Sequence, residues 1–414
     1  MIKLFTNASQ IVTCNTQGKN YKQGSELNNL EILTDHFILV ENGTIKDILP
    51  DSSLNKFVTA EKLDIKDKII LPGLVECHTH TAFAGSRANE FKDKIAGKTY
   101  EEIAKDGGGI IATVEAVRNS SLVEIIELMK PRIAEFISQG VTTLEIKSGY
   151  GLDFENEIKL LQAIKVIAEI FPIDIVSTFL GAHTYPLEFK GDHNFYIDLI
   201  NNKMTPHIAK NNLADFCDGF CESTAFSANE IDKIFSNAVH QGLKLKLHTE
   251  QFNNIGGLDV ALKHNAVSVD HLEVLQENDY SKFSNSKTVA VLLPGVSFFL
   301  DYQFAPARKL IENNAVIALA TDYNPGSSHI LNLHLMMSLA AIKMKMRVEE
   351  IINAVTINAA KALNKETSIG SIEIGKKADF SVFDTKEYPD IIYSVGRNLI
   401  SHTIKNGEII FSKN

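Results

Sequence analysis

Two histidines, His78 and His80, follow the apolar run from Ile69 to Cys77 and are separated by Thr79 alone. Residues i and i+2 of a β-strand point to the same side, so both imidazoles would face one way where the strand ends. A catalytic metal such as zinc binds neutral imidazole nitrogens and keeps one position open. The pair therefore indicates part of a metal site, although such a pair also occurs for packing reasons alone.

Further polar residues follow other apolar segments that we expect to be strands. Of the thirteen histidines, five lie at expected strand ends, and an aspartate follows the last strand; these residues are His78, His80, His183, His248, His271 and Asp322. A single histidine in such a place is usually structural or solvated. Five histidines with a terminal aspartate are difficult to explain by packing.

Three histidines and one aspartate can hold a divalent metal and leave a position for water, whose pKa falls to about 7 on the metal. Asp322 could ligate the metal and also take the proton of the attacking water. His271, uncoordinated, could orient that water or polarise a scissile carbonyl. These residue types therefore predict hydrolysis at neutral pH.

The middle of the chain alternates short apolar segments with amphipathic helical patterns. Strands are expected to begin at Leu71, Thr142, Asp174, Asp215, Leu243, Ala266, Thr288 and Ala315, and two of the helices span 122–138 and 155–170. Eight βα units over roughly 300 residues predict a (β/α)8 TIM-like barrel, an α/β fold whose catalytic residues gather at the C-terminal strand ends. A doubly wound sheet is the alternative, weakened because no Gly-x-Gly-x-x-Gly follows a first strand.

Both ends of the chain are rich in short strands. Asn42-Gly43 and Asn406-Gly407 each lie between apolar runs and predict tight hairpin turns.

Composition sets further limits. With 414 residues, 44% of them hydrophobic, the chain can bury a large core and more than one domain. Its formal charge of −10 argues against nucleic acid as a partner, because phosphate binding needs clustered Lys and Arg. The four cysteines suggest no disulfide framework, no signal peptide is apparent, and no apolar run approaches the ~18 residues of a membrane span. We therefore expect a cytoplasmic location and no membrane partner.

This set of residues resembles the amidohydrolase superfamily. The resemblance extends to Leu71-Pro-Gly-Leu-Val-Glu-Cys-His-Thr-His, Thr356-Ile-Asn-Ala-Ala-Lys-Ala-Leu and Gly370-Ser-Ile-Glu-Ile-Gly-Lys-Lys-Ala-Asp-Phe. It implies one small β-sandwich built from residues 1–68 and 369–414, beside a barrel formed by residues 69–368. Members with two metals use a lysine at the end of strand four. Here that strand is Phe216-Cys-Asp-Gly-Phe-Cys-Glu222, which has no lysine and favours a single metal.

Within the superfamily the chain is similar, over essentially its full length, to the imidazolonepropionase family of histidine degradation. The segments that carry this similarity include His80-Thr-Ala-Phe-Ala-Gly-Ser-Arg87-Ala-Asn-Glu-Phe, Glu145-Ile-Lys-Ser-Gly-Tyr150-Gly-Leu, Gly181-Ala-His183, His248-Thr-Glu-Gln-Phe and Ala320-Thr-Asp322-Tyr-Asn-Pro-Gly-Ser. The resemblance implies hydrolysis of 4-imidazolone-5-propanoate to N-formimidoyl-L-glutamate. It also implies one zinc or iron ion per subunit and a homodimer.

The family's motifs assign roles to matching residues. The implied metal ligands are His78, His80, His248 and Asp322, and the implied substrate contacts are Arg87, Tyr150, His183, Gln251, Asn324, Gly326 and Ser327. Gln251 departs from members that carry Glu there, and a neutral amide can bind but cannot shuttle a proton. The catalytic proton transfers are therefore expected of Asp322 and His271. Glu250 is adjacent, but neighbouring strand positions face opposite ways.

Arg87 supports an anionic substrate independently, because its planar fork matches a carboxylate; a loop ion pair with Glu90 is the alternative. Two other functions stay open: a nucleobase deaminase on the same fold, which would need no anion clamp, and a non-catalytic scaffold. The run Gly107–Gly109 lacks the Lys-Ser/Thr of a phosphate loop, and we expect a mobile lid or a tight turn.

Overall fold

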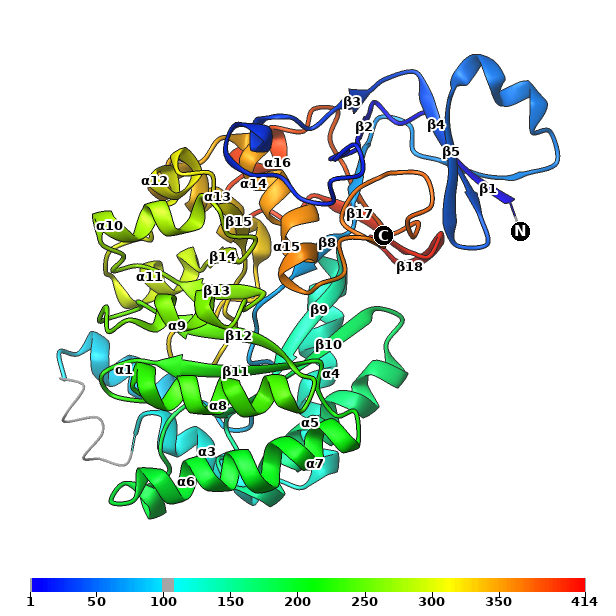
Figure 1. Cartoon of the computed structure of the whole chain (residues 1–414). Helices are drawn as coiled ribbons and strands as arrows, with labels where there is room; N and C mark the ends of the chain where they lie inside the picture. Colours follow the sequence, from blue (N-terminus) through cyan, green and yellow to red (C-terminus); the bar gives the residue numbers. More distant parts are fainter. Residues whose placement is uncertain (1, 99–107, 414) are drawn as a thin grey trace.

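The computed structural model describes residues 2–98 and 108–413 and shows a barrel with smaller sheets at one end (Figure 1). Both chain termini lie with the smaller sheets. The expected run Gly107–Gly109 falls partly outside the described residues, because Gly107 is not among them. No helix in the described part of the chain is long and apolar enough to cross a membrane.

Eight parallel strands form the barrel sheet in the order β15-β14-β13-β12-β11-β10-β9-β8. They are β8 (Leu74–Glu76), β9 (Val141–Lys147), β10 (Asp174–Ala182), β11 (Phe216–Cys221), β12 (Lys244–Thr249), β13 (Ser268–His271), β14 (Val289–Leu292) and β15 (Val316–Leu319). Seven of these strands begin within two residues of the predicted positions. The TIM-like barrel is confirmed.

The barrel closes just beyond the C-terminal ends of its first and last strands. A parallel bridge joins Thr79 to Tyr323, the Asp322 amide donates to the His78 carbonyl at 3.1 Å, and the His80 amide donates to the Tyr323 carbonyl at 2.9 Å. The seam therefore brings the two histidines found first in the sequence beside Asp322, which lies more than two hundred residues later.

Helices cover the outside of the barrel (Figure 1). They are α1 (Ala88–Ile95), α3 (Ile110–Asn119), α4 (Leu122–Ser138), α5 (Phe154–Ile170), α6 (His193–Leu199), α7 (Thr205–Lys210), α8 (Ala228–His240), α9 (Gly257–Lys263), α10 (Glu277–Tyr280), α11 (Pro294–Leu300), α12 (Ala307–Glu312), α13 (Leu333–Met344), α14 (Val348–Ala354), α15 (Ile357–Ala362) and α16 (Asp390–Tyr393). The predicted bounds of α4 are confirmed, and α5 begins one residue early. Ser121 and Glu124 form a capping box that fixes where α4 begins.

Strands from both ends of the chain build two further sheets. One has the order β5-β4-β1-β6, and the other β18-β17-β16-β7-β2-β3. The strands are β1 (Ile2–Thr6), β2 (Gln10–Val12), β3 (Ile32–Leu33), β4 (His36–Glu41), β5 (Thr44–Pro50), β6 (Glu61–Asp64), β7 (Ile69–Pro72), β16 (Phe380–Phe383), β17 (Ile400–Lys405) and β18 (Glu408–Ser412). Phe5 of one sheet and Phe380 of the other meet edge to face with ring centroids 5.1 Å apart, inside a shared apolar core.

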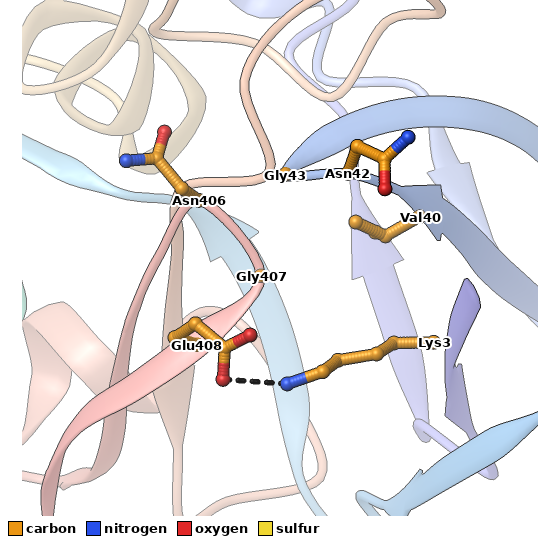
Figure 2. Close-up of a pocket in the computed structure, with 7 residues that line it drawn as sticks. All are labelled: Lys3, Val40, Asn42, Gly43, Asn406, Gly407 and Glu408. Atoms are coloured by element: carbon orange, nitrogen blue, oxygen red, sulfur yellow. Dashed lines mark hydrogen bonds and ion pairs between the residues drawn. The ribbon is translucent and has the colours of Figure 1, made fainter. Parts of the chain in front are cut away.

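The two predicted Asn-Gly hairpin turns are confirmed, and they lie against each other (Figure 2). Asn42 and Asn406 have positive φ angles of 52° and 49°, followed by Gly43 and Gly407 at 80° and 77°. A Cβ atom on Gly43 would lie 3.1 Å from the Asn406 carbonyl oxygen. Each turn thus requires glycine, and together they join the N-terminal and C-terminal sheets.

One prediction about the first barrel strand is wrong. The run from Ile69 to Cys77 is two strands in different sheets: β7 pairs with β16 of the terminal sheet, and β8 opens the barrel at Leu74 rather than at Leu71. Gly73 separates them and packs so closely on β9 that a Cβ atom there would lie 2.2 Å from Thr142 Oγ1. Strand β7, which we assigned with the barrel from residue 69, thus pairs with the terminal strands.

Candidate metal centre and substrate cavity

The barrel seam gathers a first group of ligand atoms. His78 Nε2 lies 3.3 Å from Asp322 Oδ1, and His80 Nε2 lies 3.2 Å from the same oxygen. All three side chains are at most 3% exposed, and neither His78 Nε2 nor Asp322 Oδ1 has a hydrogen-bond partner. Buried polar atoms are rarely left unpaired, so these two atoms point to a missing occupant.

His248, at the end of β12, contributes a fourth atom. Its Nε2 lies 3.3 Å from His80 Nε2. Ligands at about 2.1 Å from a tetrahedral ion are separated by about 3.4 Å. Three separations, from Asp322 to His78, from Asp322 to His80 and from His80 to His248, are 3.2 to 3.3 Å and match that spacing. The donor types of these four side chains suit one divalent metal.

Two buried carboxylates orient two of these imidazoles from behind. Asp270 Oδ2 accepts from His78 Nδ1 at 2.6 Å, and Asp218 Oδ1 accepts from His248 Nδ1 at 3.1 Å. Metal-binding histidines commonly donate their second ring nitrogen in this way, which directs the other nitrogen at the metal.

The two carboxylates belong to a buried ion cluster inside the barrel, which the sequence analysis missed. Lys147 Nζ lies 2.8 Å from Asp218 and 2.9 Å from Glu145, and Lys246 Nζ lies 3.2 Å from Glu145. All of these side chains, with Asp270, are fully buried. Residue alternation could have revealed this cluster, because charged residues two positions apart share one side of a strand. The pairs are Glu145 with Lys147 and Lys246 with His248. Both lysines are already paired.

The electrostatics of the cluster follow from burial and these carboxylates. Burial lowers the pKa of His248 to about 3, and it also lowers the pKa of His80. Burial and Lys147 act to lower the pKa of His78, but Asp270 and Asp322 raise it to about 9. A metal binds neutral imidazole, so metal uptake must displace a proton from His78.

His271 approaches the same centre from the end of β13. It forms a second possible ligand trio with His78 and His248, while His78, His80 and Asp322 form the first. Its Nδ1 lies 3.6 Å from Glu273 Oε1, and neither atom has a hydrogen-bond partner. His271 and Leu272 both have positive φ angles, 89° and 73°, which side chains adopt at a cost and which often mark functional sites.

A cavity of about 660 Å³ opens above the metal centre. Three of the four candidate ligands line this cavity, and the fourth, His78, is fully buried below it. Every expected substrate contact lines it too. The residues of both groups that line the cavity are His80, Arg87, Tyr150, His183, His248, Gln251, Asp322, Asn324, Gly326 and Ser327. His271 also lines it, whereas Glu250 does not and instead accepts from the Leu258 amide at 3.2 Å. The structure thus brings together what the sequence placed on separate strands.

Aromatic rings line the cavity wall nearest His80. His183 stacks on His80 with centroids 5.2 Å apart, and Tyr150 lies 5.3 Å from His183. His183 Nδ1 donates to the Gly149 carbonyl at 2.9 Å, which leaves Nε2 available to a ligand. Burial lowers the pKa of His183 well below its ordinary value and raises that of Tyr150, so both rings are neutral at pH 7.

Arg87 lines the cavity together with two other cationic residues, Lys94 and Lys98. Arg87 Nε donates to Glu90 Oε2 at 2.8 Å and Arg87 Nη2 lies 2.8 Å from the same oxygen, so the ion pair expected as the alternative is present. That pair uses one edge of the guanidinium, and Nη1 lies on the other, toward Gly326. Arg87 can therefore keep its ion pair with Glu90 and still bind an anion.

Comparisons with known proteins place this arrangement in a family. The profile of the Amidohydrolase family matches residues 69–410. The imidazolonepropionase of Christiangramia forsetii is 41% identical over 413 residues, covering 99% of this chain and 100% of that protein. That of Thermoanaerobacter pseudethanolicus is 45% identical over 383 residues, covering 92% of each. The chain belongs to the imidazolonepropionases of the amidohydrolase family. This amidohydrolase is therefore a hydrolase, with a His/Asp cluster suited to the family's metal cofactor.

Solved structures of other amidohydrolases share the fold. A zinc-bound adenosine deaminase from Xanthomonas campestris superposes with a TM-score of 0.75 at 17% identity, covering 99% of this chain and 93% of that one. Guanine deaminase from E. coli gives 0.72 at 14% identity and covers both chains completely. At such identities these likenesses show the fold alone.

Proposed function

We propose that this amidohydrolase hydrolyses 4-imidazolone-5-propanoate to N-formimidoyl-L-glutamate in histidine degradation. One observation supports the proposal beyond the family: the buried trio His78, His80 and Asp322, with His248 3.3 Å from His80, lies at a cavity whose rim holds Arg87. The substrate has a ring amide to be cleaved and a propanoate tail to be bound, and the cavity offers a group for each.

The proposed ligands are His78, His80, His248 and Asp322, holding one zinc or iron ion per subunit. A bound divalent metal supplies an activated water and polarises the scissile carbonyl. The single ion agrees with strand β11, which offers Asp218 rather than lysine, and Asp218 is already bonded to His248 and Lys147.

The chain's own residues then move protons. Water adds to the ring carbonyl carbon, the ring C–N bond breaks, the carbon becomes a carboxylate, and the released nitrogen takes a proton. We assign removal of the water's proton to the Asp322 carboxylate, and polarisation of the carbonyl or orientation of the water to His271. Gln251 binds the ring but carries no proton.

Residues of the cavity wall orient the substrate. Arg87 binds the propanoate carboxylate, because a guanidinium makes charge-assisted hydrogen bonds to it. The neutral rings of Tyr150 and His183 pack on or donate to the imidazolone. The loop Asn324–Ser327 lies beside the carboxylate formed from the ring.

The decisive experiment follows the ultraviolet absorbance of the imidazolone ring after enzyme is added. Metal-loaded protein should cause decay and yield formimidoylglutamate, and protein treated with a chelator should do so only after zinc or iron is restored. Metal analysis by mass spectrometry should give one ion per chain. No decay with metal-loaded protein would remove the substrate assignment.

The structural likeness to deaminases keeps a nucleobase deaminase as the second candidate. Ammonia release from guanine or adenosine, measured on the same metal-loaded protein, tests it. Arg87 argues against it, since a neutral base needs no anion clamp. Assembly as a homodimer in the cytoplasm is proposed from the family, and light scattering of the purified protein tests the dimer.

A further inference from the structure

Gly326 lies directly against the end of the Arg87 side chain. A Cβ atom built on Gly326 would lie 2.1 Å from Arg87 Nη1 and 3.0 Å from Arg87 Cζ, far inside contact distance. The Arg87 guanidinium therefore occupies the space that a side chain at position 326 would fill. Gly326 has no positive φ angle, so its backbone does not itself require glycine.

The loop that carries Gly326 is fixed from within. Asn324 Oδ1 accepts from the amides of Gly326 and Ser327, both at 2.7 Å, and Asn324 Nδ2 donates to the Asp322 carbonyl at 2.7 Å. Asn324 is only 4% exposed. The loop therefore cannot move aside without breaking bonds that begin at Asp322, the proposed metal ligand.

Glu90 holds Arg87 from the opposite side. Arg87 Nε and Nη2 both lie 2.8 Å from Glu90 Oε2, and Nη1 lies on the side of Gly326. The position of Arg87, which follows β8, thus depends on the loop that follows β15. If an atom is added at Gly326, the flexible side chain of Arg87 must move, because hydrogen bonds from Asn324 hold the loop in place.

We propose that Gly326 is the specificity-determining position that sets where Arg87 presents its charge, and thus how far a carboxylate tail can lie from the metal centre. The inference rests on the proposed function. It assigns Gly326 an effect that passes through Arg87, in addition to the contact with the substrate already proposed for its loop.

The first test is the variant Gly326→Ala. It should keep its metal content and melting temperature, because only the far end of a flexible side chain must shift, while KM for imidazolonepropionate rises about 10- to 100-fold with kcat within about threefold. Gly191→Ala is the matched control, since nothing lies within 4 Å of a Cβ atom there, and it should behave as wild type. A Gly326→Ala enzyme with wild-type KM would overturn the proposal.

A double-mutant cycle separates this route from direct contact. If Gly326 acts through Arg87, then adding Gly326→Ala to Arg87→Ala should raise KM by less than Gly326→Ala raises it in the wild-type enzyme. Fully multiplied losses in the double variant would show that the two residues act independently, and would refute the proposal.

A binding measurement keeps the inference independent of turnover. Calorimetry on metal-loaded protein should show that wild type prefers 3-(imidazol-4-yl)propanoate to 4-methylimidazole, and that Gly326→Ala loses this preference while binding 4-methylimidazole as before. An unchanged preference would overturn the inference. If wild type shows the preference but does not consume imidazolonepropionate, the proposed function fails and the role of Gly326 stands.

Discussion

Asp322 has to satisfy two demands with one carboxylate. Burial acts to raise its pKa, but the neighbouring imidazoles of His78 and His80 hold the pKa well below its ordinary value. The carboxylate is thus anionic at neutral pH, as a metal ligand and proton acceptor must be. Its backbone has a positive φ of 49°, a conformation that side chains adopt at a cost.

Replacing Asp322 by asparagine should lower kcat by about 100- to 10,000-fold, because the amide neither carries the charge nor accepts the proton. Metal content measured on the same sample separates the two roles. A near-normal kcat would exclude Asp322 as the base.

Arg87→Ala should lower kcat/KM for imidazolonepropionate by about 10- to 150-fold, the cost of losing a charge-assisted hydrogen bond of ~1.5–3 kcal/mol. The loss should appear mainly in KM, since the tail is remote from the bond that breaks. Steady-state kinetics on both constants test this. Unchanged values would contradict the anion clamp.

At the scale of elements, four barrel strands share one buried ion cluster. β9 supplies Glu145 and Lys147, β11 supplies Asp218, β12 supplies Lys246 and β13 supplies Asp270. Each charge is costly to bury alone and is offset by its neighbours. The cluster therefore ties the strands together beneath the metal centre, while its carboxylates orient His78 and His248.

Lys147→Met should lower the free energy of unfolding by about 3–5 kcal/mol, because Asp218 and Glu145 lose a buried partner. Urea unfolding of metal-free protein measures this without contribution from the metal. Lys165→Met, at an exposed position of α5, serves as the control and should change stability by less than about 0.5 kcal/mol. A Lys147→Met protein as stable as this control would show that the cluster contributes little.

At the scale of the whole molecule, the terminal sheets are joined to the barrel by charge as well as by apolar contact. Asp174, at the start of β10, lies 2.8 Å from Lys405 of β17 and 3.0 Å from Lys377. Burial acts to raise its pKa, but the two lysines, Lys405 foremost, bring the pKa below the ordinary 3.8.

Stability that comes from a depressed carboxyl pKa is present above the unfolded value and is lost as pH falls through the folded value. Asp174→Asn should therefore cost about 1 kcal/mol at pH 7, discounted because the group is partly exposed, and the deficit should shrink below pH 3.8. Denaturant titrations at several pH values test this, with Asp198→Asn, on the exposed face of α6, as control. A deficit that is constant with pH would exclude the ion pairs as its cause.

Local sequence patterns were sufficient for most elements. Alternation and apolar runs located seven barrel strands within two residues, and Asn-Gly turns located both terminal hairpins, because those signals depend on neighbours in the chain. The run from Ile69 to Cys77 was misread as one strand because it is mostly apolar. Pro72-Gly73 is a local breaking signal at the point where the run divides, and the close packing of Gly73 on β9 accompanies the change of sheet.

The sequence by itself determined the residue types of the candidate metal centre, since His78, His80, His248 and Asp322 stand where strands end. Tertiary structure alone decided that Asp322 lies 3.2 to 3.3 Å from His80 and His78, because barrel closure at Thr79 and Tyr323 joins segments far apart in the chain. It also decided which charges pair inside the barrel and that Gly326 makes room for Arg87. These facts depend on distances between strands and loops, which residue order does not contain.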